Sequence, residues 1–81
     1  MKKINEETIT ALIGNALRID TNLISINSSS ESVEEWDSLG HLSILESLDR
    51  HFDGKVANII ELASSNSVKK ILSILRKNSL L

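Results

Sequence analysis

The residue with the clearest potential for chemistry is a serine, Ser38, in the run WDSLGHL that spans residues 36–42. The residue before it, Asp37, is of a type that caps helices, because its carboxylate accepts hydrogen bonds from first-turn N–H groups. Ser38 would then occupy the first helical position, where free N–H groups and the helix dipole favour an anion such as a phosphate. We therefore expect the Ser38 hydroxyl to be able to carry a phosphate ester.

The surroundings of Ser38 argue against catalysis by the chain itself. His41 follows three residues later, but no second carboxylate is placed to orient it, as a Ser-His-Asp hydrolase requires. The chain has no cysteine, so it offers no thiol nucleophile, zinc–thiolate site or redox pair. Its two histidines, His41 and His51, lack the neighbouring ligands of a stable metal site. We expect a protein that is not an enzyme, with Ser38 modified by a separate enzyme.

A purely structural role for the Asp-Ser pair is the simplest alternative, since the pair is ordinary at helix starts and the chain has thirteen serines. Three features favour a special role. Leu39 lies beside Ser38 and is expected to be at least partly exposed. Gly40 lies in the first turn, where glycine costs about 1 kcal/mol relative to alanine, and this makes sense if something approaches the backbone closely. In addition, a long polar connection at about residues 20–37 ends at this serine, and such loops in small domains are often functional.

The elements that must position Ser38 are helices, because apolar residues recur at spacings of three and four and the alternation typical of strands is missing. The pattern predicts an all-α chain with three main helices and one short one around a long first connection. The expected helices span about residues 5–18, with Asn5 as the cap, about 38–51, about 57–63 for the short one, and about 68–77 after the serine-rich cluster 64–67.

Apolar residues at helical spacing predict which faces are buried. The expected core residues are Ile9, Leu12, Ile13, Ala16 and Leu17 in the first helix, Leu42, Leu45, Leu48 and Phe52 with Ile44 beside them in the second, and Val68, Ile71, Leu72 and Leu75 in the last. Leu23, Ile24, Ile26 and Val33 are expected to pin the long connection to the core. Leu39 lies off the stripe and is expected to be exposed, Trp36 to be a packing anchor, and His41 to be a surface residue.

Length and charge restrict the class of protein further. Eighty-one residues make a single domain over residues 1–81, and a net charge of −2 argues against general nucleic-acid binding. No run approaches the roughly 18 apolar residues of a membrane span. The segment 1–7 has two lysines but no apolar stretch after them, so we expect no signal peptide and a cytoplasmic protein.

The triplet Asp37-Ser38-Leu39, followed by the leucines at helical spacing and by Phe52, resembles the signature of the acyl carrier protein family. Val56, the pair Ser67-Val68 and the last apolar stripe continue the resemblance over nearly the whole chain. The resemblance implies a small four-helix bundle with 4′-phosphopantetheine joined to Ser38 through a phosphodiester. A phosphopantetheinyl transferase would supply the arm from coenzyme A with magnesium, which Asp37 would help to hold transiently. The arm would end in a thiol that carries acyl groups as thioesters.

We expect the pathway and the partners to differ from those of primary fatty acid synthesis, whose carriers usually have a strongly acidic second helix. Here the run WDSLGHL looks more like specialised carriers, and Arg50 would oppose part of the attraction that acidic residues exert on basic partners. The expected partners are a loading ligase and downstream transferases, all bound transiently by a monomer. The predicted partner-recognition residues are Asp37, Leu39, Gly40, His41, Leu42, Glu46 and Asp49.

Alternatives remain within and outside the carrier class. An aminoacyl carrier, for example for D-alanine, differs from an acyl carrier only in its cargo, because an aminoacyl group needs no apolar space between the helices. A helical adaptor whose Ser38 is never modified is an alternative from another class, and a small hydrolase is a distant third.

Overall fold

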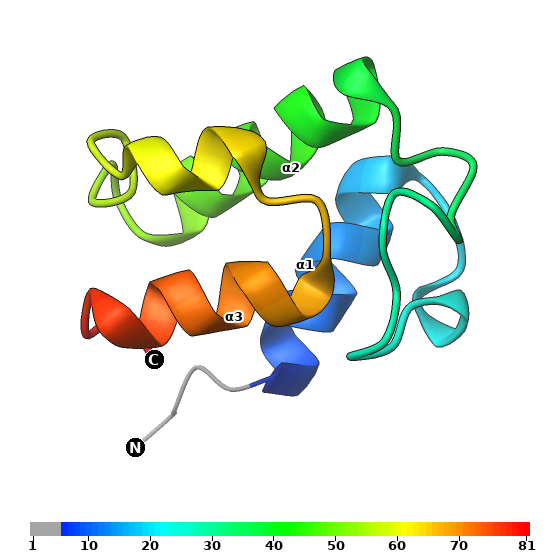
Figure 1. Ribbon diagram of the computed structural model, residues 1–81, viewed down its shortest axis with the longest axis horizontal. Helices are drawn as coiled ribbons and strands as arrows, with labels where there is room; N and C mark the ends of the chain where they lie inside the picture. Colours follow the sequence, from blue (N-terminus) through cyan, green and yellow to red (C-terminus); the bar gives the residue numbers. More distant parts are fainter. Residues whose placement is uncertain (1–5) are drawn as a thin grey trace.

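The computed structural model describes residues 6–81 and is helical, as predicted. Its elements are the helices α1 (Glu6–Leu17), α2 (Ser38–His51) and α3 (Val68–Lys77) and the 3-10 turns η1 (Thr21–Leu23) and η2 (Ile60–Ser64) (Figure 1). Within residues 6–81 there is no strand, and the single β-bridge pairs Ser29 with Ser67. The expected cap Asn5 lies outside the described residues. No helix in this part of the chain is long and apolar enough to cross a membrane.

The short helix expected at residues 57–63 is replaced by the 3-10 turn η2, so the structure has three α-helices and not the predicted bundle of four. The residue before the turn, Ile59, provides no side-chain cap. A five-residue element also gains too few hydrogen bonds to offset the cost of nucleating an α-helix. Burial of Leu62, which is 2% exposed, holds this turn against the core instead.

The core lies where the three helices meet. Its fully buried members are Ile9 and Ile13 of α1, Ile44 and Leu48 of α2, and Val68, Ile71, Leu72 and Leu75 of α3. The fully buried residues of α1 and α3 belong to the predicted stripes, whereas Leu12 and Ala16, also predicted in the core, are half-buried. The predicted stripe of α2 is wrong at its start, because Leu42 is 57% exposed and Leu45 is half-buried. The face of α2 that points into the core carries Ile44, Leu48 and Phe52, four residues apart. The end of α1 packs closely against the first turn of α2.

Backbone hydrogen bonds hold the long connection against the start of α3. Figure 1 shows the teal part of this connection beside that end of the helix. The Ser30 N–H donates to the Asn66 carbonyl at 2.9 Å, and the Val68 N–H donates to the Ser28 carbonyl at 3.0 Å. Of the four residues expected to pin this segment, only Ile24 and Val33 are buried. The other two, Leu23 and Ile26, are 69% and 37% exposed, which corrects that expectation.

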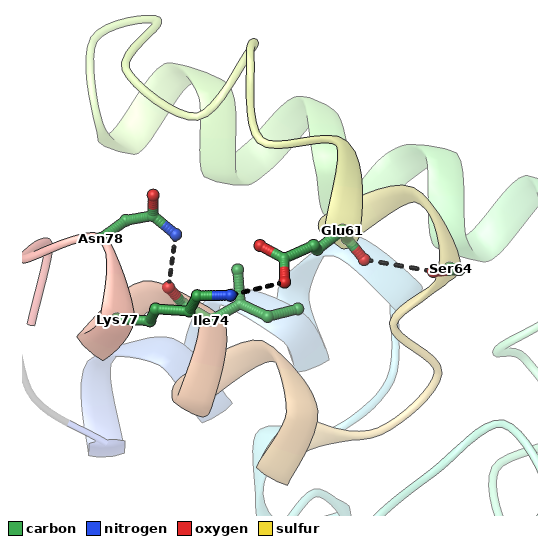
Figure 2. Close-up of polar contacts among 5 residues, drawn as sticks. All are labelled: Glu61, Ser64, Ile74, Lys77 and Asn78. Atoms are coloured by element: carbon green, nitrogen blue, oxygen red, sulfur yellow. Dashed lines mark hydrogen bonds and ion pairs between the residues drawn. The ribbon is translucent and has the colours of Figure 1, made fainter.

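The turn η2 is also joined to α3 by polar contacts. Figure 2 shows the Lys77 ammonium reaching the Glu61 carboxylate, with Nζ and Oε2 3.0 Å apart, and the Ser64 hydroxyl donating to the Glu61 carbonyl. Both charged side chains are more than half exposed, so this ion pair contributes less than about 1 kcal/mol to stability. Apolar burial therefore does most to hold η2 in place.

Candidate functional site

Asp37 and Ser38 lie where α2 begins, in the arrangement that the sequence predicts. Asp37 has extended backbone angles, and its Oδ1 accepts a hydrogen bond from the Gly40 N–H at 2.8 Å. Ser38 is the first residue of α2 and is exposed. Its hydroxyl has no hydrogen-bond partner within residues 6–81. The serine thus stands free at the positive end of a helix dipole, where an attached phosphate would be stabilised.

The capping role of Asp37 leads to a testable prediction about stability. Replacement by alanine removes the acceptor of the Gly40 N–H, and we expect Asp37→Ala to lower the free energy of unfolding by about 1 kcal/mol. Urea denaturation followed by circular dichroism measures this loss. Asparagine caps as well as aspartate, so Asp37→Asn is the matched control and should stay close to the wild type. Equal losses in both variants would show that the carboxylate charge, and not the cap, matters.

Gly40 is required by a close approach, but the approaching group belongs to the chain itself. A Cβ atom at this position would lie 2.1 Å from the carbonyl oxygen of Glu35 and 2.8 Å from Cδ2 of Leu17. Glycine therefore lets α1 and the end of the long connection pack directly against the first turn of α2. This contact fixes the direction from which the chain enters the helix at Ser38.

His41 is not the surface residue that the sequence suggests, because both of its ring nitrogens are engaged inside the fold. The Trp36 indole N–H donates to His41 Nδ1 at 3.1 Å, and His41 Nε2 lies 2.9 Å from the Leu62 carbonyl oxygen. The two rings are stacked at an interplanar angle of 15°. Trp36 is 3% exposed, which confirms it as a packing anchor. His41, which lies in α2, thus links this helix to the long connection through Trp36 and to η2 through Leu62.

An open cavity of about 620 Å³ lies beside Ser38, between the first half of α2 and the end of η2 with the residues that follow it. It is lined by Ser30, Trp36, Asp37, Ser38, His41, Leu42, Leu45, Ala63, Ser64, Ser65 and Asn66. A second cavity, of about 470 Å³, adjoins it, because Leu45 and Ala63 line both. Apolar residues such as Val56 and Ile59 dominate the second cavity. The two together form a trough that follows α2 from Ser38 as far as Asp49.

The predicted partner-recognition residues divide into two groups. Asp37, Leu39, Leu42 and Glu46 are exposed, with Leu39 76% accessible, as expected for a residue off the core stripe. Gly40, His41 and Asp49 are half-buried. The Asp49 Oδ1 atom is buried and has no hydrogen-bond partner among the described residues. The exposed group surrounds Ser38 and continues down the outer side of α2.

Sequence reasoning missed the contributions of the segment 62–66 to this site. The carbonyl of Leu62 accepts from the Ser65 hydroxyl at 2.7 Å as well as facing His41, and Ser65 is 2% exposed. No local pattern in the sequence would predict that the Leu62 carbonyl faces an imidazole 21 residues earlier in the chain. Within residues 6–81, no three His, Cys, Asp or Glu side chains are grouped to hold a metal ion.

Comparisons of this chain with models of protein families, with curated proteins and with solved structures found no significant match.

Proposed function

We propose that this protein is a carrier domain whose Ser38 hydroxyl bears 4′-phosphopantetheine and whose arm presents acyl groups as thioesters to partner enzymes. The observation that carries the proposal is the position of Ser38. It is an exposed serine at the first residue of a capped helix, beside an open trough. A phosphodiester at this point gains the helix dipole and free N–H groups, and the trough offers the attached arm a surface along α2.

The contacts of His41 support a carrier in preference to a hydrolase. A general base for Ser38 would need a ring nitrogen free to accept the hydroxyl proton. Both ring nitrogens of His41 already face Trp36 and Leu62. Neither ring nitrogen is thus free to accept the Ser38 proton in this arrangement, and we assign the modifying chemistry to a phosphopantetheinyl transferase. Asp37, exposed beside the serine, is our candidate for the transient magnesium contact during that transfer.

The lining of the trough favours an acyl cargo over an aminoacyl one. Beyond Leu45 the lining residues are mostly aliphatic, and Ile60 at the far end is 85% exposed. An apolar chain placed there would cover surface that water now contacts, which is favourable at about 25 cal/mol per Å² of apolar area. The loading ligase and the downstream transferases of such a cargo are proposed as transient partners. Exposed Leu39 and Leu42, next to Ser38, are proposed as their contact points.

The experiment that tests the proposal is transfer of the arm in vitro. The purified chain is incubated with coenzyme A, magnesium and a transferase of broad specificity, and its intact mass is measured. We expect one phosphopantetheine per chain in the wild type and complete loss of the addition in Ser38→Ala. Ser43→Ala, another serine of α2, is the matched control and should be modified like the wild type. Failure of several transferases to modify the folded wild type would contradict the carrier function.

A further inference from the structure

The bridge made by His41 permits only one arrangement of its protons. An indole N–H is a donor and never an acceptor, so the Nδ1 atom that faces Trp36 must be the unprotonated nitrogen. A neutral imidazole then carries its proton on Nε2, and this N–H donates to the Leu62 carbonyl. Both contacts are therefore satisfied by the same neutral tautomer, and each one favours it.

Protonation of His41 affects the two sides of the bridge differently. A proton on Nδ1 would place two donors opposite each other, 3.1 Å apart, and the hydrogen bond to Trp36 could not exist. The hydrogen bond to Leu62 would remain and would become charge-assisted. The Trp36 indole, 3% exposed, would then hold an unpaired N–H in the core. Protonation thus acts on the link between α2 and the long connection and spares the link to η2.

We propose that His41 is a pH-sensitive positioning residue of the Ser38 site: its neutral imidazole holds the Trp36 indole in the wall of the adjoining cavity, and its protonation releases that indole. Trp36 and His41 both line this cavity together with Ser38. Release of the indole changes the shape of the cavity and loosens the segment that leads into the capped serine. The switch is a property of the unmodified chain and does not depend on the proposed arm.

The ionisable side chains near His41 are paired elsewhere or exposed to solvent, so the protonation of His41 itself decides whether it accepts from the Trp36 indole. Among the residues that line the cavity with it, the one other ionisable side chain is Asp37, whose Oδ1 is engaged by the Gly40 N–H. On η2, Glu61 pairs with Lys77 of α3. In the segment before the tryptophan, Glu34 and Glu35 are exposed to solvent. The contact itself needs the neutral imidazole, because a proton on Nδ1 removes the acceptor of the Trp36 indole N–H.

Nuclear magnetic resonance of the unmodified chain tests the switch directly, because Trp36 is the only tryptophan and the chain has two histidines. The pH is lowered from about 8 to about 5, the range in which histidine changes charge. The ring signals of His41 report its protonation, and the indole N–H signal reports the hydrogen bond. We expect the indole signal to shift and to lose protection from solvent exchange along the titration curve of His41. Acrylamide should quench the fluorescence of Trp36 more strongly at the acidic end.

Three variants separate the switch from a general effect of acid. In His41→Gln the amide oxygen can accept from the indole at every pH, so the indole signal should become independent of pH. His51→Gln, at the exposed far end of α2, is the matched control and should respond like the wild type. Trp36→Phe removes the indole N–H, so the contact with His41 Nδ1 should be absent in this variant at every pH. The proposal is overturned if His41 becomes protonated while the indole stays protected, if His41 does not titrate in this range, or if His41→Gln keeps the wild-type response.

Discussion

Replacement of Gly40 by alanine is expected to lower the free energy of unfolding by about 3 kcal/mol, at the upper end of the usual cost of overpacking. On helix propensity alone the same change would stabilise α2 by about 1 kcal/mol. The expected change in stability is a loss and not a gain, because the new methyl group would lie 2.1 Å from the Glu35 carbonyl oxygen. Leu17 can change rotamer to relieve its own contact, but a backbone carbonyl moves only with the chain around it.

Urea denaturation of Gly40→Ala measures this effect, with Ser43→Ala as the matched control on the same helix. Ser43 is half-buried and its change should alter stability by no more than about 0.5 kcal/mol. The displaced carbonyl of Glu35 precedes Trp36 and Asp37, so the strain should also disturb the helix cap. An alanine variant as stable as the wild type would contradict the close approach of the Glu35 carbonyl to the first turn of α2.

Truncation of Trp36 is expected to have the largest effect of any change in the long connection. Removal of a buried tryptophan side chain costs about 3–5 kcal/mol, and the indole is 3% exposed and bonded to His41. A domain of this size has a total stability near the lower part of the range of about 5–15 kcal/mol. We therefore expect Trp36→Ala to be partly unfolded at room temperature and to lose most of its cooperative thermal transition.

Thermal unfolding followed by far-ultraviolet circular dichroism measures the effect without the tryptophan signal. Leu39→Ala, in the neighbouring first turn of α2, is the control for loss of a large apolar side chain, because Leu39 is 76% exposed and its truncation should hardly change the midpoint. Comparable midpoints for Trp36→Ala and Leu39→Ala would mean that the long connection is held by its backbone hydrogen bonds to Asn66 and Val68 and not by the indole.

Features that depend on neighbours in the chain were predictable from the sequence. The bounds of α2 agree with the predicted helix at 38–51, and Asp37 and Ser67 cap α2 and α3 as their residue types indicate. A helix cap and a helical period depend only on residues within a few positions of one another, so a single sequence is enough to predict them. The same locality explains why Leu39 was expected, correctly, to be exposed.

Features that depend on contacts between distant segments were not predictable from the sequence. The stripe predicted for α2 and the observed one share Leu48 and Phe52, and the periodicity alone could not choose between Leu42 and Ile44 at the start of the helix. The close packing of Glu35 and Leu17 against Gly40 makes that choice, because it brings α1 onto the face that Ile44 shares. The aliphatic run at 57–63 similarly reads as a helix, whereas burial of Leu62 and the contacts of Glu61 with α3 hold it as a 3-10 turn.

The sequence by itself determined that a capped, exposed serine opens an amphipathic helix, because that arrangement needs only Asp37, Ser38 and the helical period that follows. Only the tertiary structure decided what surrounds the serine. It brings Leu62 to an imidazole 21 residues earlier in the chain and turns His41 inward. It also opens a trough along α2, because side chains from α2, the long connection and the segment after η2 meet there. No local pattern encodes such a meeting, since it depends on how the buried faces of separate elements pack together.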